Sequence, residues 1–252
     1  MELRTLQFIS PSGHSFTIRE QNGEDENILS NPVDIKTLMN LTKFISAIVV
    51  STDFTTSGRL TVQDTLELPL LDKYCILIQS RIFSLGEDLD ITYDWPKTGK
   101  VEYVENLSNY IFSDYSIPPT ESELESKPHA VPYYVMGKQL KDIDITLASG
   151  KKVRFDILNG NGEQYIINLP EAKQTRNNEL IARNLRLEVN GVFEKVSNFS
   201  SFNVREMAEL RKIVKSLDPV FDGLTELENP DTGEVVMYPV MVSPTFFFLT
   251  EA

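Results

Sequence analysis

The alternation of apolar and polar residues predicts a β-hairpin near the start of the chain and another after residue 140. Leu6 and Phe8 alternate with polar residues before a turn at residues 11–14, and the alternation resumes at Phe16. Residues 143–147 and 153–157 alternate in the same way on either side of a Ser-Gly turn. Successive strand side chains point to opposite faces, so each pair of runs indicates two half-buried antiparallel strands.

Apolar residues at helical spacing predict helices between and after these hairpins. Asn22 and Asn159 are placed to cap two short ones, because an Asn side chain accepts hydrogen bonds from a helix N-terminus. Longer helices are expected over residues 35–50, within residues 62–85, over residues 175–187 and over residues 202–217.

Two Pro-x-Thr-Gly turns predict one more hairpin in each half of the chain. Pro96 opens the first turn and Pro230 opens the second, and a β-rich run follows each. Proline fixes φ and glycine tolerates positive φ, so the pair favours a tight turn that leads into a strand.

The two halves carry these signals in the same order. The Ser-Gly turn and the Asn-Gly-x-x-Glu helix start recur 137 residues later, and the Pro-x-Thr-Gly turn recurs 134 residues later. Nearly constant spacing of several motifs is typical of a duplication, whereas the alternative is two sets of ordinary hairpin turns. We therefore predict an α+β fold of two pseudo-repeated modules, each with a β-hairpin, helices and a second β-hairpin.

The boundary between the modules is predicted at residues 117–132. This segment holds four prolines and three glutamates and few large apolar residues. Such a composition builds no core, so it indicates a linker or surface loop between modules 1–116 and 133–252. The alternative is an extended arm that packs on a neighbouring subunit, with residues 133–136 either as a docking strand or as a simple edge strand.

Composition excludes several classes of protein. The net charge of −13 and the pI of about 4.7 argue against a nucleic-acid-binding surface, which needs a basic footprint. They fit docking to basic protein surfaces or simple solubility. The single Cys75 allows no internal disulfide and no multi-cysteine metal site, and it is expected to be a buried, inert thiol. We expect no membrane span and no signal peptide, and hence a reducing cytoplasm.

No catalytic, cofactor-binding or metal-ligating residue is predicted. His14 and His129 lie far apart in sequence, and acid–base catalysis needs a histidine with an oriented partner. Gly160-x-Gly162 begins like a dinucleotide fingerprint, but Tyr165 stands where its third glycine belongs. We therefore expect no cofactor there.

Two groups of carboxylates are interpreted as solvated surface. Asp142, Asp144 and Asp156 alternate with apolar residues, which indicates the wet face of a sheet rather than a metal cluster. The second group is expected to form a solvated acidic rim and consists of Asp218, Asp222, Glu226 and Glu228.

The aromatic run near the end of the sequence is the predicted partner-binding segment. It comprises Phe246, Phe247, Phe248 and Leu249. Three adjacent strand side chains cannot all face one core, so another segment or another chain should cover part of this surface. The alternative is a tail that packs into the core of its own chain.

The order of motifs in the second half points to one family. These motifs are Leu169-Pro170-Glu171, Thr175-Arg176-Asn177, Ala182-Arg183-Asn184-Leu185, Leu217-Asp218-Pro219 and Pro244-x-Phe246-Phe247-Phe248. In this order they resemble the baseplate hub subunit and hub assembly chaperone family of contractile-tailed, T-even-type bacteriophages. The first half resembles the N-terminal part of that family to a lesser degree.

The resemblance implies a zinc knuckle at the repeated turn in many relatives. Its cysteine positions are occupied here by Trp95, Thr98, Asn229 and Thr232. A zinc knuckle needs thiolate ligands, so we expect no zinc and degenerate knuckles held by packing and hydrogen bonds.

The function implied by the resemblance is a non-enzymatic role in assembly of the baseplate hub, through contacts with other phage tail proteins. A transient assembly chaperone would work in the host cytoplasm. The alternative is a permanent structural subunit of the virion tail baseplate, and an uncharacterised enzyme is the remote alternative.

Overall fold

The computed structural model describes residues 4–134, 137, 139–242 and 246–248. It contains helices and antiparallel sheets, so the predicted α+β class is confirmed. None of the helices in these described ranges is long and apolar enough to cross a bilayer.

The first half begins with a three-stranded antiparallel sheet and ends with a separate hairpin. The sheet has the order β1-β2-β3 and consists of β1 (Thr5–Ile9), β2 (Ser15–Arg19) and β3 (Val49–Thr52). Its helices are α1 (Gly23–Leu29), α2 (Pro32–Ile35), α3 (Met39–Ile48), α4 (Val62–Glu67) and α5 (Leu70–Leu85). The hairpin and the elements after it are β4 (Asp88–Trp95), β5 (Gly99–Asn106), η1 (Leu107–Tyr110) and α6 (Glu121–Ser126).

The second half places a four-stranded antiparallel sheet before its own separate hairpin. The sheet has the order β6-β7-β8-β9 and consists of β6 (Ile143–Thr146), β7 (Lys152–Phe155), β8 (Arg186–Val189) and β9 (Val192–Lys195). Its helices are α7 (Gly160–Ile167), η2 (Glu171–Lys173), α8 (Asn178–Ala182) and α9 (Val204–Leu217). The last elements are β10 (Leu224–Glu228), β11 (Val235–Pro239) and η3 (Val240–Val242).

The helices expected over residues 35–50 and 175–187 are shorter in the structure. The first is α3, which ends where β3 begins at Val49. The helix expected over residues 175–187 is only the five-residue α8, because Asn184 adopts a left-handed φ of 52° and the chain then joins the sheet as β8. The helix expected within residues 62–85, starting at Asp64 or at Pro69, is α5, and a short helix, α4, precedes it. Asp64 completes the capping box of α4, and α5 begins after Pro69.

Local geometry recurs between the halves at the predicted spacing. Gly13 and Gly150 have φ of 83° and 87°, which is the left-handed region that glycine tolerates. Asn22 and Asn159 each cap the helix after the first hairpin through a side-chain oxygen. The order of elements is also similar in the two halves, although the duplication itself stays a prediction.

The hydrophobic core crosses the predicted module boundary. One cluster combines Cys75 of α5 with Phe155 of β7 and Leu210 of α9, and it includes Val131 from the predicted linker. A second cluster lies within the first half around the β1-β2-β3 sheet. The boundaries at 1–116 and 133–252 stay predictions, but the two segments share one core.

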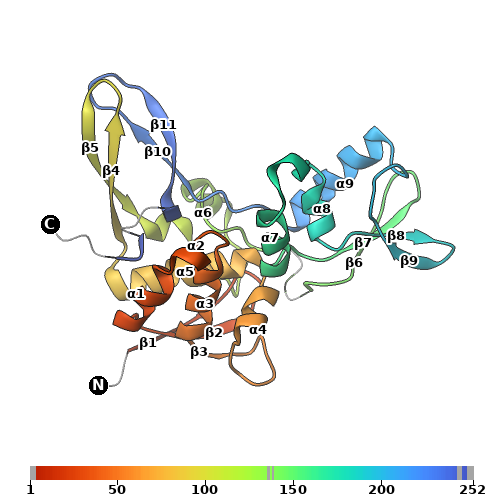
Figure 1. Cartoon of the computed structure of the whole chain (residues 1–252), viewed down its shortest axis with the longest axis horizontal. Coiled ribbons are helices and arrows are strands. Elements are labelled where there is room, and N and C mark those ends of the chain that lie inside the picture. Colours follow the sequence, from red (N-terminus) through yellow and green to blue (C-terminus); the bar gives the residue numbers. More distant parts are fainter. Residues whose placement is uncertain (1–3, 135–136, 138, 243–245, 249–252) are drawn as a thin grey trace.

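Figure 1 shows the two separate hairpins standing side by side at one end of the molecule. We call the pair β4–β5 and β10–β11 the hairpin arm. The β6–β9 sheet with α8 and α9 lies toward the opposite end of the long axis (Figure 1).

Candidate functional site

The hairpin arm brings together the two Pro-x-Thr-Gly turns, where the resemblance implies zinc knuckles in many relatives. Asn229 is buried, and its Nδ2 donates a hydrogen bond of 2.7 Å to Thr98 Oγ1 in the other hairpin. Its Oδ1 accepts from the backbone N–H groups of Asp231 and Thr232. The side chain therefore fixes its own turn and joins it to the other turn, 131 residues away in sequence.

A second polar chain joins the same hairpins below the turns. Trp95 is buried, and its Nε1 donates to Tyr103 Oη at 2.9 Å. Tyr103 Oη donates in turn to the carbonyl of Glu228 at 3.0 Å. Trp95, Thr98 and Asn229, three of the four positions where the resemblance implies cysteines, thus take part in hydrogen bonds that hold the arm together.

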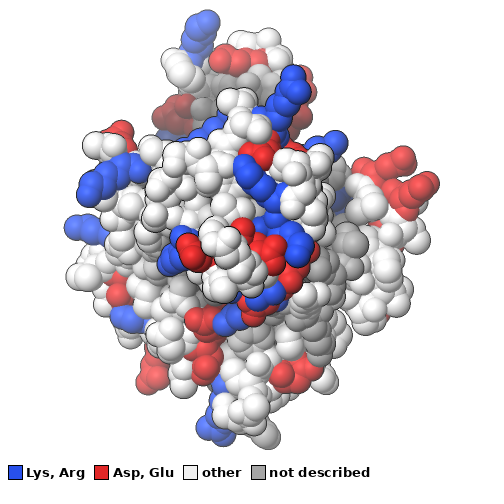
Figure 2. All heavy atoms as spheres, turned by 90° about the vertical axis from the view of Figure 1, so that its right-hand side faces the viewer, with Lys and Arg blue, Asp and Glu red and all other residues white. Residues whose placement is uncertain are grey.

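The hairpin arm is strongly acidic. Residues 88–106 and 224–239 contain nine carboxylates and two lysines, so they carry −7 of the net charge of −13. The predicted acidic rim is correct for Glu226 and Glu228, which are exposed on β10, and for the exposed Asp222. Figure 2, viewed from the β8–β9 side of the molecule, shows Lys and Arg interspersed with acidic residues over that face.

The prediction of a solvated acidic rim is wrong for Asp218. It is buried, and its carboxylate accepts from Arg183 and from the backbone N–H of Leu158. Arg183 is buried as well and also contacts Glu179. Sequence patterning placed Asp218 with its acidic neighbours because the pairing residue is far away in sequence.

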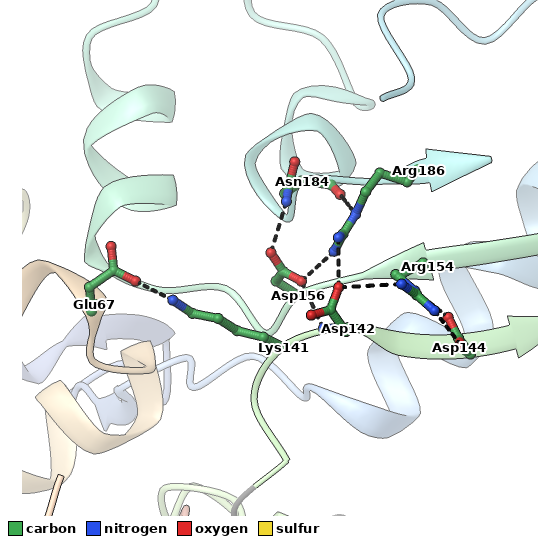
Figure 3. Close-up of polar contacts among 8 residues, drawn as sticks. All are labelled: Glu67, Lys141, Asp142, Asp144, Arg154, Asp156, Asn184 and Arg186. Atoms are coloured by element: carbon green, nitrogen blue, oxygen red, sulfur yellow. Dashed lines mark hydrogen bonds and ion pairs between the residues drawn. The ribbon is translucent and has the colours of Figure 1, made fainter. Parts of the chain in front are cut away.

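A cavity of about 380 Å³ lies where α4 meets α7 and the β6–β9 sheet, and polar residues surround it. Figure 3 shows the carboxylates of Asp142, Asp144 and Asp156 pointing toward Arg154 and Arg186. Arg154 donates to Asp144 at 2.6 Å, and Arg186 donates to Asp142 and Asp156 at 2.7 and 2.6 Å. The hydrogen bonds from Arg154 lower the pKa of Asp144. Asp144 is exposed on β6, as predicted, whereas Asp142 and Asp156 lie just outside the strands and Asp156 is half-buried; all three form ion pairs. Among the described residues, no group of three or more His, Cys, Asp or Glu side chains could hold a metal ion.

The two glycines that resemble a dinucleotide fingerprint have a packing role. A Cβ at Gly160 would lie 3.0 Å from the backbone of Leu66 in α4. A Cβ at Gly162 would lie 2.6 Å from Leu158 and 3.0 Å from the carbonyl of Ala182. Glycine therefore lets α7 pack closely against its neighbours, which explains the motif without a bound nucleotide.

Each histidine lies beside one carboxylate. His14 Nδ1 lies 2.9 Å from Asp53 Oδ1 at the first turn. His129 Nδ1 lies 3.5 Å from Asp222 Oδ1. A buried ion pair between Lys73 and Glu163, at 2.5 Å, connects α5 to α7 and so joins the two halves.

An apolar groove runs along the predicted linker. Its volume is about 530 Å³, and α6 forms one of its walls. Its lining residues are Phe112, Pro118, Pro119, Leu124, Lys127, Pro128, Ala130, Pro132 and Tyr133. Lys127 donates to the carbonyls of Ser108 and Ile111, which closes this segment into a surface loop rather than a free linker.

The residues of the predicted partner-binding run differ in burial. Phe246 is fully buried in the main core cluster, so the alternative of a tail packed into its own chain describes this residue. Phe247 and Phe248 are partly buried, and Phe247 packs edge-on against Phe44 of α3 at 6.0 Å. Leu249 lies outside the described residues. Partner contact through Phe247 and Phe248 stays a prediction.

The groove has no counterpart among the features predicted from the sequence. Its lining residues come from both ends of a segment that composition marks as unable to build a core. The groove forms only where the tertiary fold packs that segment beside Phe112. The proline-rich composition was the available signal, because proline stiffens an exposed loop and leaves apolar surface uncovered.

Comparison with known protein families, with curated proteins and with solved structures finds no match to this chain. The arrangement by itself defines an α+β protein with a projecting double-hairpin arm and an apolar surface groove.

Proposed function

We propose that this protein is a non-enzymatic phage tail protein that acts in the assembly or structure of the baseplate hub through protein–protein contacts. One observation carries the proposal. The two Pro-x-Thr-Gly hairpins that resemble the family's knuckles form one arm, joined by the Asn229–Thr98 hydrogen bond. If the two hairpins are zinc knuckles that have lost their cysteines, hydrogen bonds between them would hold the arm in shape in place of the metal ions.

The surface features support a binding role. The groove at residues 112–133 has apolar walls, and α6, which forms one of them, carries three glutamates that are not among the lining residues. The surface therefore suits an apolar partner segment with basic residues beside it. The arm offers a second, acidic surface. A transient chaperone in the host cytoplasm and a permanent subunit of the virion baseplate would both use such surfaces, and an enzyme is the remote alternative.

Quantitative mass spectrometry separates the two roles. Purified phage particles and infected-cell lysate are compared for this chain and for other tail proteins. Presence in particles at a fixed ratio identifies a structural subunit, whereas presence in lysate alone, with a hub protein co-purifying, identifies an assembly chaperone. Absence from particles together with no captured tail protein would overturn the proposal.

A matched pair of variants tests the groove. Leu124 is half exposed and lines the groove, whereas Ile117 is exposed nearby and does not line it. Leu124→Arg should lose hub proteins captured from infected-cell lysate, and Ile117→Arg should retain them. Equal capture by both variants would place the contact elsewhere on the molecule.

A further inference from the structure

The outer face of the β10–β11 hairpin is an unpartnered sheet face of mixed character. Glu226 pairs in register with Met237, and Glu228 pairs with Val235. Met237 and Val235 are 47% and 48% exposed, while Leu227 on the opposite face of the hairpin is buried. Two carboxylates therefore alternate with two half-exposed apolar side chains on this face, and no described residue buries them.

A cavity between α8 and α9 has the complementary character. Its volume is about 250 Å³, with Leu180, Val214 and Val220 as its apolar lining. Its cations are Arg176, Arg211 and Lys215. Val220 is also largely exposed, so the apolar part of this cavity is open to a ligand from outside.

The positive charge of this cavity is not neutralised by its own carboxylates. Glu179 and Asp218 line it too, but both are engaged by Arg183. Arg176 and Lys215 have no ion-pair partner among the residues that the structure describes. Arg211 donates through Nη2 to Asn177, and its buried Nε has no acceptor in the described part of the chain.

We propose that the hairpin arm of one copy docks into the α8–α9 cavity of a second copy. Met237 enters the apolar cavity, and Glu226 and Glu228 face the cations at its rim. Methionine suits this role because its unbranched side chain adapts to irregular pockets. Charge complementarity selects the second copy: the arm concentrates negative charge, while the cavity presents three cations in a chain of net charge −13.

This contact joins two different surfaces, so each added copy can bind a further copy in the same way. Figure 1 shows the arm projecting away from α8 and α9, so the two surfaces do not meet within one chain. A contact between unlike surfaces leaves a free arm at one end and a free cavity at the other. Such head-to-tail contacts generate a ring when the rotation closes and a filament when it does not. The inference does not depend on the proposed phage role.

Analytical ultracentrifugation of the full chain tests the contact with charge-reversal variants. The wild-type weight-average mass should rise above the monomer mass of 28.6 kDa as concentration increases. Glu226→Lys with Glu228→Lys, and separately Arg176→Glu with Lys215→Glu, should each weaken association on the order of 100-fold, because like charges then oppose each other. The quadruple variant exchanges the charges and should regain association at the wild-type net charge.

A matched control separates docking from net charge. Glu121→Lys with Glu125→Lys makes the same change in net charge on exposed positions of α6. This control should associate like the wild type, whereas simple relief of acidic repulsion would strengthen association in both lysine variants. A wild-type chain that stays monomeric, or an oligomer that survives both charge reversals, would overturn the proposal.

Discussion

Asp72 on α5 is the residue at which burial and charge oppose each other most directly. Its carboxylate is fully buried and accepts hydrogen bonds from the backbone N–H of Ser12 at 3.0 Å and from the Ser12 hydroxyl. Burial raises its pKa to about 6 although these hydrogen bonds and His14 favour the charged form. The turn after β1 is thus tied to α5 by a carboxyl group whose charged form is destabilised by burial.

The free energy of unfolding should depend on pH through Asp72. The folded-state pKa lies above the ordinary value of 3.8, so the folded chain binds this proton more tightly than the unfolded chain does. Stability should therefore increase as pH falls from 7 to 5, by about 1 kcal/mol. Asp72→Asn should lack this increase, because the amide is neutral throughout and still accepts from Ser12.

Denaturant unfolding of both proteins at pH 7, 6 and 5 measures the difference. The range stays above pH 4.5 because Glu206, whose pKa is held at about 2 by the hydrogen bond from Lys151, loses its contribution only in stronger acid. Parallel pH profiles for the wild type and Asp72→Asn would show that Asp72 does not titrate in this range.

At the scale of elements, the hairpin arm depends on contacts between hairpins rather than within them. Two-stranded hairpins are marginal alone in water, so each needs the other's apolar face. Tyr93 of β4 packs edge-on against Tyr238 of β11 at 6.2 Å. Thr225 of β10 donates to Glu105 of β5 at 2.7 Å. The arm is therefore one unit made from segments far apart in sequence.

The Asn229–Thr98 hydrogen bond should be measurable as a coupling between the hairpins. Asn229→Ala removes this bond and two bonds to its own turn, so it should cost about 1–3 kcal/mol of stability. Thr98→Val should cost about 1 kcal/mol. The double variant should cost less than the sum of the two changes, because each removes the same bond.

A second double-mutant cycle, on a pair of residues that do not touch, provides the control for this measurement. The Asn106 side chain caps the turn after β5 through Ser108 N and does not contact Thr98. Asn106→Ala and Thr98→Val should therefore add. Additivity of Asn229→Ala with Thr98→Val would instead show that the two hairpins are not coupled through this pair.

At the scale of the whole molecule, the two halves are joined by a shared core and a buried ion pair. Lys73 on α5 and Glu163 on α7 are both buried, and breaking such a pair leaves an uncompensated charge. The bridge between Pro69 and Asn159 adds a backbone connection at the same place. The halves resemble repeated modules in element order, yet they are packed as one body.

Neither half should fold alone. Residues 1–132 and residues 133–252, purified separately, would each expose a large part of the shared core. Their amide NMR spectra should lack the dispersion of the intact chain, and mixing them should restore part of it. As a control, the intact protein cut at a protease site inserted after Glu125, an exposed position on α6, should keep its fragments together. A dispersed spectrum from either half alone would contradict the prediction.

Local sequence determined the parts of this protein whose cause is local. The caps at Asn22, Asn159 and Asn203 and the tight turns at Gly99 and Gly233 depend on residues within a few positions of each other. The α+β class followed from the same local signals. The solvated face of the β6–β9 sheet could also be predicted, because strand alternation alone places Asp144 outward.

Tertiary structure decided what depends on residues distant in sequence. Asp218 is buried because Arg183 reaches it, and Phe246 is buried because the main core has room for it. Residues 175–187 show the same effect, since pairing of β8 with β7 competes with helix formation and wins. The joining of two hairpins into one arm and the apolar groove also depend on distant contacts, and no pattern within a short window encodes them.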